Sequence, residues 1–179
     1  MGASARRARL DPRGIKGLHP IAPALCSRGI FGRKEDTTIH TTHLTVRYAE
    51  TDRMGVTHHA NYLVWYEQAR TELTKKLGTS YGELEAMGFL SPVLSVNTEY
   101  LRPCTYDDEI VVKCCLTKAT YSQMEFSYRV YKNGEDTPIN RGSSRHAWVD
   151  KETFRPISIK RKAPKLYELL CNAVEQIEE

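Results

Sequence analysis

The sequence Asp52-Arg53-Met54-Gly55-Val56-Thr57-His58-His59-Ala60-Asn61-Tyr62 separates two segments with different residue patterns. Before it, residues 37–50 are rich in β-branched side chains and alternate in polarity, which predicts a strand. After it, residues 60–77 carry apolar side chains at helical spacing, and Gly78 follows as a helix-ending glycine. The stretch therefore joins a strand directly to the start of a long helix.

A carboxylate, Asp52, lies just ahead of this predicted helix start. The first N–H groups of a helix have no partner inside the helix and lie at the positive end of its dipole. A carboxylate there can supply an attacking oxygen or activate water, while a backbone N–H receives a developing oxyanion. The pairing suits acyl transfer, and the alternative is a turn aspartate that only bonds its own backbone.

The rest of the chain predicts a short helix, four strands and a closing helix. Ser80 and Glu83 form a capping box at the start of the short helix, and Asn133-Gly134 is a strong hairpin signal. The predicted ranges are 80–87 for the short helix, 89–101, 109–120, 122–131 and 139–149 for the strands, and 165–177 for the closing helix.

The order of these elements predicts an α+β roll. Short connections between the last four strands force antiparallel pairing, so one curled sheet must cover one long helix. A sheet of this kind has open edges, and it covers a helix with a broad apolar face only in part. We therefore expect two protomers to join edge to edge.

Length and charge limit the kinds of partner. The 179 residues suit one domain, and no run approaches the roughly 18 apolar residues that a membrane span needs. Residues 1–34 carry eight basic residues and one acidic residue, a net charge of +7. The whole chain has a net charge of +4, so residues 35–179 carry −3. A mildly acidic fold makes nucleic acid an unexpected partner.

The basic N-terminal stretch predicts a domain boundary. Residues 1–36 have scattered glycine and proline and no sustained apolar period, so we interpret them as a disordered basic arm before a folded domain at 37–179. The arm is rich in arginine and poor in acids, as organelle transit peptides are. The predicted location is cytoplasmic, with organelle targeting through the arm as the alternative.

The five cysteines, an odd number without a C-x-x-C pair, favour free thiols in a reducing compartment. No second cysteine or histidine lies at ligand spacing from any of them, which argues against a zinc site. We therefore expect no metal and no cofactor.

A family resemblance rests on the block from Tyr48-Ala-Glu-Thr-Asp52 to Asn61-Tyr62, followed by Glu67-Gln-Ala-Arg70. The block resembles the signature of the hotdog-fold acyl-CoA thioesterases of the 4-hydroxybenzoyl-CoA thioesterase family, and most nearly their bacterial branch associated with the Tol-Pal operon. The similarity runs from about Thr41 to Pro156.

The resemblance implies a fold and an activity. The fold is a hotdog, a five-stranded antiparallel sheet wrapped around a long central helix, here with an added C-terminal helix. The activity is hydrolysis of an acyl-CoA thioester to a free acid and coenzyme A by a homodimer or homotetramer. Acyl carrier protein thioesters stay open as substrates, and so does the acyl group, aliphatic or aromatic.

The resemblance also implies site residues. Asp52 is the catalytic base or nucleophile, and the backbone N–H of His59 polarises the thioester carbonyl. Glu67 is a secondary catalytic candidate, because a related hotdog subgroup carries its carboxylate on the central helix; the alternative is a pairing with Arg70 or Thr71 one turn on. The candidate substrate-binding residues are Tyr48, Gly55, Val56, His58, Asn61 and Tyr62.

Plainer interpretations accompany several of these candidates. Asn61 could cap the helix or stabilise its entry, and Tyr48 and Tyr62 could be core aromatics that also line the acyl pocket. We expect the side chains of His58 and His59 to diverge, which disfavours joint metal binding. The alternative functions are a hotdog 3-hydroxyacyl-thioester dehydratase and a non-catalytic acyl-thioester-binding protein.

Overall fold

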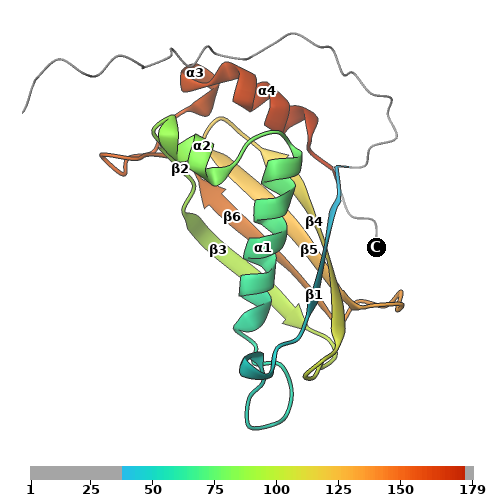
Figure 1. Ribbon diagram of the computed structural model, residues 1–179. Coiled ribbons are helices and arrows are strands. Elements are labelled where there is room, and N and C mark those ends of the chain that lie inside the picture. The colour runs from blue at the N-terminus through green and yellow to red at the C-terminus, as the bar shows by residue number, and fades with distance from the viewer. Residues whose placement is uncertain (1–37, 176–179) are drawn as a thin grey trace, which may run out of the picture. The chain divides into compact units, whose positions relative to one another are not determined.

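The computed structural model describes residues 38–175, and the predicted arm at 1–36 lies outside them. Within this range one sheet of five antiparallel strands wraps around one long helix (Figure 1). The strand order is β1-β4-β5-β6-β3. The bounds are His40–Thr45 for β1, Val93–Tyr100 for β3, Glu109–Ala119 for β4, Gln123–Lys132 for β5, Asn140–Ala147 for β6 and Asn61–Lys76 for the helix α1. The predicted α+β arrangement is confirmed.

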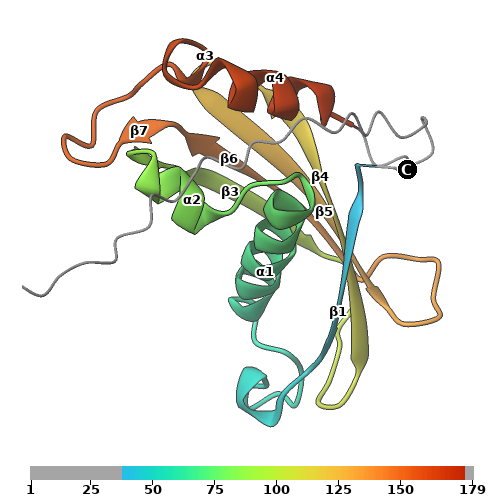
Figure 2. The ribbon, with the colours of Figure 1, turned by 45° about the horizontal axis from the view of Figure 1, so that its top comes forward.

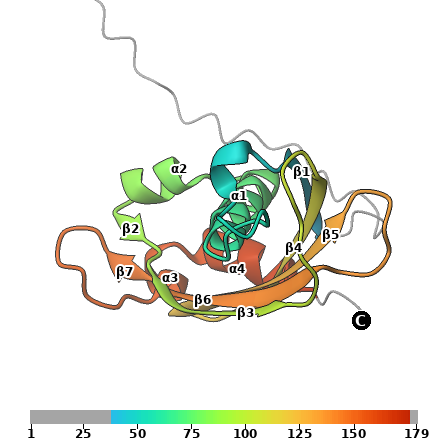
Figure 3. The ribbon, with the colours of Figure 1, turned by 90° about the horizontal axis from the view of Figure 1, so that it is seen from below.

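Helix α1 packs on the concave side of the sheet because its apolar positions recur at helical spacing. Tyr62, Tyr66, Ala69 and Leu73 are buried there at 3% exposure or less. The opposite side of α1 leaves Glu67 and its neighbours exposed. Figure 3 shows the sheet curving around one side of the helix.

The predicted first strand, 37–50, is too long. In the described residues β1 ends at Thr45, and Tyr48–Glu50 forms one 3₁₀ turn, η1. The turn forms because the Glu50 carboxylate accepts hydrogen bonds from the backbone N–H and the guanidinium of Arg47, three residues earlier. This local pairing competes with the strand that the alternating polarity predicts.

The predicted strand at 89–101 is in fact two strands. Phe89–Leu90 forms β2, which pairs with β7 at Val149–Asp150, and β3 begins at Val93. Pro92 lies between them and has no N–H to donate to a ladder, so the pairing changes there.

The helices at the far end agree with prediction in kind and differ in bounds. The short helix α2, Tyr81–Ala86, begins after Ser80, whose hydroxyl accepts from the Glu83 N–H at 3.3 Å. The closing helix α4, Pro164–Asn172, ends before the predicted 177, and a short helix that was not predicted, α3 at Ile159–Lys162, precedes it. Figure 2 places α3 and α4 at one end of the sheet, away from η1.

The Asn133-Gly134 signal marks a hairpin, as predicted, because β5 and β6 pair on either side of it. The connection covers residues 133–139, with Gly134 at a φ of 79°, so it is longer than a two-residue turn. No helix among residues 38–175 is long and apolar enough to cross a membrane.

Candidate active site

A closed loop follows η1 and holds Asp52. Thr51 and Thr57 form a bridge across its base, the Asp52 N–H donates to the Val56 carbonyl at 3.0 Å, and the Gly55 N–H donates to the Asp52 carbonyl at 2.9 Å. Gly55 has a φ of +78°, in the left-handed region that favours glycine. The turn glycine is therefore required by the backbone of this loop.

The two oxygens of the Asp52 carboxylate are in different situations. Oδ1 accepts a hydrogen bond from the Met54 N–H at 2.8 Å, which is the interaction expected of a turn aspartate. Oδ2 has no hydrogen-bond partner among residues 38–175. One oxygen thus fixes the side chain, and the other remains available to a substrate or to water.

The turn between the loop and α1 leaves one amide unpaired. The Thr57 N–H donates to the Cys104 carbonyl, the His58 N–H to the Glu50 carbonyl, and the Asn61 N–H to the His58 carbonyl. The Ala60 N–H donates to Nδ1 of His58 at 3.3 Å. In the described part of the chain the His59 N–H has no acceptor, so it is free to bind an oxyanion.

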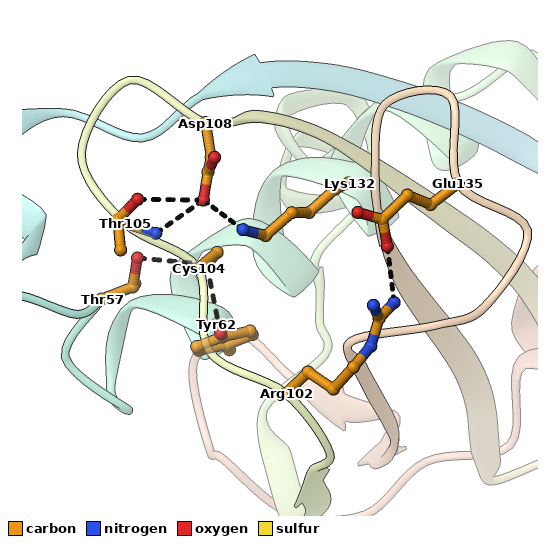
Figure 4. Close-up of polar contacts among 8 residues, drawn as sticks. All are labelled: Thr57, Tyr62, Arg102, Cys104, Thr105, Asp108, Lys132 and Glu135. Atoms are coloured by element: carbon orange, nitrogen blue, oxygen red, sulfur yellow. Dashed lines mark hydrogen bonds and ion pairs between the residues drawn. The ribbon is translucent and has the colours of Figure 1, made fainter.

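The thiol of Cys104 connects this loop to the helix (Figure 4). Its sulfur lies 3.2 Å from the hydroxyl of Thr57 and 3.2 Å from that of Tyr62. Burial, together with the hydrogen bond to Cys104, raises the pKa of Tyr62 well above its ordinary value. Tyr62 is therefore a neutral phenol that packs and orients, and not an acid or base at neutral pH.

A cavity of about 310 Å³ opens beside the loop and the turn. Its wall is mostly apolar, with one carboxylate and one guanidinium, as small-molecule sites usually are. The residues that line it are Asp52, Met54, Val56, Thr57, His59, Tyr62, Tyr100, Leu101, Arg102 and Pro103.

Two ion pairs lie near this cavity (Figure 4). Arg102 donates from Nη2 to Glu135 at 2.7 Å and to the Thr137 carbonyl at 2.6 Å. Lys132 pairs with Asp108 at 2.8 Å, and Asp108 also accepts from the Thr105 N–H. Arg102 therefore supplies positive charge to the cavity while it is already partly neutralised.

Comparison with known proteins identifies the family. The model of the thioesterase-like superfamily matches residues 46–170. The chain belongs to the thioesterase-like superfamily.

Individual relatives agree with this membership. The chain is 41% identical to the "Putative acyl-CoA thioesterase YneP" of Bacillus subtilis, over 68% of this chain and 87% of the relative. It is 30% identical to the acyl-CoA thioester hydrolase YbgC of Escherichia coli O157:H7, over 68% and 90%. The crystal structure of DHNA-CoA thioesterase from Staphylococcus aureus superposes with a TM-score of 0.71 at 32% identity, covering 75% of this chain and 89% of that one. The predictions of a hotdog fold and of a thioester hydrolase are confirmed.

Among the residues predicted for this thioesterase-like site, the structure brings four to the cavity wall: Asp52, Val56, His59 and Tyr62. Gly55 forms the loop turn without lining the cavity. Asn61 donates from its side-chain amide to the Glu50 carbonyl at 2.7 Å, and Ala60 is the residue that precedes the helix. Asn61 therefore stabilises the helix entry without being its N-cap.

Three other predicted residues do not line the cavity in the single chain. Tyr48 is 78% exposed and packs edge-on against Tyr106, with ring centroids 5.7 Å apart, so it is not a core aromatic. Glu67 lies on the exposed side of α1, and its side chain has no partner within 38–175, so the alternative ion pair with Arg70 is absent there. His58, the third, lies on the turn itself.

The expectation that His58 and His59 diverge is wrong. Their ring centroids are 4.1 Å apart with an interplanar angle of 33°. Both residues precede the first helical turn, and the Ala60 N–H bond to His58 Nδ1 folds the first ring back toward the second. No group of three or more potential metal ligands occurs in the described range.

No sequence motif predicts that Tyr100 and Cys104 reach the site. Tyr100 closes β3, and Arg102 and Cys104 follow in a connection that carries no chemical motif. They reach the turn because β3 pairs with β6 and ends beside the N-terminal end of α1, an arrangement set by sheet order. The one available signal is the end of the predicted strand followed by Arg-Pro.

Proposed function

We propose that this chain hydrolyses an acyl-CoA thioester to a free acid and coenzyme A, with Asp52 and the His59 N–H as the two reacting groups. One observation carries the proposal. A carboxylate with one free oxygen and the single unpaired N–H of residues 57–61 belong to residues that line the same cavity.

The chemistry needs little more than these two groups. A thioester carbonyl is electrophilic and its thiolate leaves readily, so a Ser-His-Asp triad is not required. In the general-base route, Asp52 takes a proton from water as the water oxygen attacks the carbonyl carbon. The His59 N–H binds the resulting oxyanion. The tetrahedral intermediate then expels the thiolate, which recovers the proton from Asp52.

A nucleophilic route uses the same geometry. The free oxygen of Asp52 attacks the carbonyl carbon, the thiolate leaves, and a mixed anhydride remains on the carboxylate. Water then cleaves the anhydride and regenerates Asp52. Both routes require one Asp52 oxygen without a partner, so the structure supports them equally.

The cavity wall suggests how a substrate lies. Val56, Met54 and Tyr62 offer apolar surface for an acyl group, and Arg102 offers a cation for the phosphates of coenzyme A by exchange with Glu135. YneP and YbgC carry names of enzymes that act on acyl-CoA, which supports this choice over acyl carrier protein.

We infer a homodimer joined through β3. This strand is at one edge of the sheet, and seven of its eight residues are exposed. Val93, Leu94 and Val96 are apolar and 39–51% exposed. An open apolar edge favours pairing with a second copy of the same strand. Light scattering after size exclusion should give a dimer, and Val96→Lys should give a monomer.

The thiols support a proposal for the compartment. Among the described cysteines, Cys104, Cys114 and Cys171 are free thiols, as expected in a reducing environment. We propose the cytoplasm, with an organelle interior as the alternative if residues 1–36 act as a targeting signal. A fluorescent fusion to residues 1–36 distinguishes the two, since a cytosolic signal removes the organelle alternative.

Thiol release tests the proposed function. Wild type and Asp52→Asn are compared on short, long and aromatic acyl-CoA substrates. We expect kcat to fall by roughly a hundredfold to ten-thousandfold in the variant, with the fold retained. Asp136→Asn, an exposed aspartate in the β5–β6 connection, is the control and should match wild type.

The same panel decides against the alternatives. Equal rates for wild type and Asp52→Asn would remove Asp52 from the mechanism. Binding of substrates without turnover would favour a non-catalytic acyl-thioester-binding protein. Loss of water from a 3-hydroxyacyl-CoA would favour a dehydratase, which needs a helix carboxylate at the site; Glu67 does not line the cavity.

A further inference from the structure

Glu50 is a buried carboxylate that the proposed reaction does not use. Its side chain is among the few charged ones in the described core, at 4% exposure. The carboxylate accepts from the Arg47 N–H at 2.8 Å, from Arg47 Nη2 at 3.0 Å and from the indole of Trp65 at 3.1 Å. Burying a charge is unfavourable unless its hydrogen bonds are satisfied, and here they are.

These bonds keep Glu50 ionised. Burial acts to raise the pKa of Glu50, but the hydrogen bonds from Arg47 and Trp65 outweigh it and the pKa is lower than usual. The side chain therefore ties η1 to Trp65, a buried residue one helical turn inside α1.

The backbone carbonyl of Glu50 holds the turn that contains the unpaired amide. It accepts from the His58 N–H at 2.8 Å and from the Asn61 side-chain amide at 2.7 Å. These two donors flank His59. The carboxylate and the carbonyl of one residue thus fix the helix and the turn relative to each other.

Tyr100 holds His59 from the other side. Its hydroxyl donates to the His59 carbonyl at 3.0 Å, and its ring packs edge-on against that of Tyr62, with centroids 5.2 Å apart. The peptide before the His58–His59 peptide is held by Glu50, and the peptide after it is held by Tyr100. The His59 N–H between them has a fixed direction and no acceptor.

We propose that Glu50 is a positioning residue that presents the His59 N–H to the thioester carbonyl, with the Tyr100 hydroxyl as a second support. The proposal rests on the proposed function, because it assigns the oxyanion to this amide. A donor that is already oriented stabilises the oxyanion without reorganisation, and a displacement of about 1 Å can lower the rate about a hundredfold.

Kinetics give the first test. Glu50→Gln keeps the size of the side chain but places an amide N–H₂ among donors, so the turn should shift. We expect kcat to fall roughly tenfold to a hundredfold, with KM changed less than about threefold. Trp65→Phe and Tyr100→Phe each remove one donor and should lower kcat about threefold to tenfold.

A matched control separates positioning from general stability. Glu72 is another carboxylate that ties β1 to α1, through Thr42 and through His40 at 3.0 Å, and it does not line the cavity. Glu72→Gln should lower the melting temperature without changing kcat. If Glu72→Gln lowers kcat as much as Glu50→Gln does, the positioning role is wrong.

A spectroscopic test reads the amide directly. An acyl-CoA with an isotope-labelled carbonyl is bound to Asp52→Asn, and its C=O stretch is measured by isotope-edited infrared difference spectroscopy. The oxyanion donor should move the band to lower frequency than in water. Adding Glu50→Gln should return it part of the way.

The two failures are distinguishable. A band that stays unshifted in Asp52→Asn contradicts the proposed function. A band that shifts in Asp52→Asn and stays equally shifted with Glu50→Gln contradicts the positioning role alone. If Glu50→Gln does not fold, Tyr100→Phe and Trp65→Phe in the same Asp52→Asn background give the same decision.

Discussion

Two polar regions along helix α1 differ in how completely their hydrogen bonds are satisfied. At the N-terminal end, the loop and turn of residues 51–61 leave one Asp52 oxygen and the His59 N–H without partners in the described chain, beside a cavity. In the second half of the helix, Arg70 begins a buried chain of hydrogen bonds in which each group has a partner.

The buried chain runs away from the helix through the sheet. Arg70 donates to Tyr81 at 2.9 Å and to Tyr128 at 3.3 Å, Tyr128 lies 2.7 Å from Ser144, and Ser144 lies 2.8 Å from Nε2 of His146. Because arginine can only donate, the hydroxyls of Tyr128 and Ser144 donate onward, and neutral His146 accepts.

The two ends of α1 therefore have different roles. Unpaired groups beside a cavity can bind and react, whereas matched buried groups hold the fold in one arrangement. We therefore expect substitutions of the unpaired groups in the first region to change activity with little effect on stability, and substitutions of the paired groups in the second region to do the reverse.

Replacing Arg70, the cation of the buried hydrogen-bond chain, should cause the largest loss of stability. Arg70→Ala removes two charge-assisted hydrogen bonds and the packing of the arginine stem, and should lower the free energy of unfolding by about 3 kcal/mol. Urea unfolding measures it. Arg141→Ala removes an exposed pair with Glu99 and should change stability by less than about 0.5 kcal/mol.

Activity completes this test. At a temperature where Arg70→Ala is folded, its kcat should stay within about threefold of wild type. A loss of kcat as large as that of Asp52→Asn, without loss of stability, would show that the two regions are one functional unit.

Acid should weaken the second region through His146. Burial, and then the charge of Arg70, lower the pKa of His146 from 6.5 to about 4. The unfolded chain binds a proton near pH 6.5 and the folded chain does not, so stability is present above that pH and is lost as pH falls toward 4. The loss should reach roughly 2 kcal/mol at about pH 5.

Two histidine variants test whether His146 causes this loss of stability. His146→Gln should remove the pH dependence between about pH 5 and 6.5, whereas His43→Gln, at an exposed position, should keep it. The carboxylates Glu50 and Glu72 have lowered pKa values and titrate below this window. An unchanged slope in His146→Gln would contradict the neutral buried histidine.

Much of the fold was predictable because its signals are local. The spacing of Tyr62, Tyr66, Ala69 and Leu73 predicts α1 and its buried face, and the alternation of polarity predicts the strands. The Asp52–Tyr62 stretch likewise predicts a carboxylate next to a helix start. The end of β1 at Thr45 and the break between β2 and β3 at Pro92 depend on hydrogen-bond pairing, which the alternation of polarity does not encode.

The rest of the site depends on contacts between distant segments. Glu50 belongs to a stretch that alternates like a strand, and its burial depends on the Trp65 indole fifteen positions along. Tyr100 reaches His59 because the order of the sheet places the end of β3 beside α1. Neither contact can be predicted from the spacing of residues in the sequence.

A smaller effect should come from the loop glycine. Gly55→Ala places a side chain at a φ of +78° and should lower stability by about 1 kcal/mol, with loss of activity as Asp52 becomes less fixed. Gly82→Ala lies in α2 with open space around it and should raise stability by about 0.5 kcal/mol or more. Thermal unfolding measures both. A stabilising Gly55→Ala would contradict the strained turn.

The smallest expected effect belongs to Glu67, which lies between the two regions. Its carboxylate is exposed, lacks a partner within the described chain and does not line the cavity. Glu67→Gln should therefore change kcat/KM less than about threefold in the thiol-release assay, with Asp52→Asn measured beside it.

A large effect of Glu67→Gln would change the comparison itself. The exposed side of α1 would then face a thioester held by a second protomer, and the site would need both copies. In that case Val96→Lys, which should separate the dimer at β3, would lower activity as much as Glu67→Gln does. The double variant would then lose no more activity than either single variant. If Val96→Lys gives active monomers, the loop and turn of one chain are sufficient, and Glu67 belongs to the solvated face of the helix.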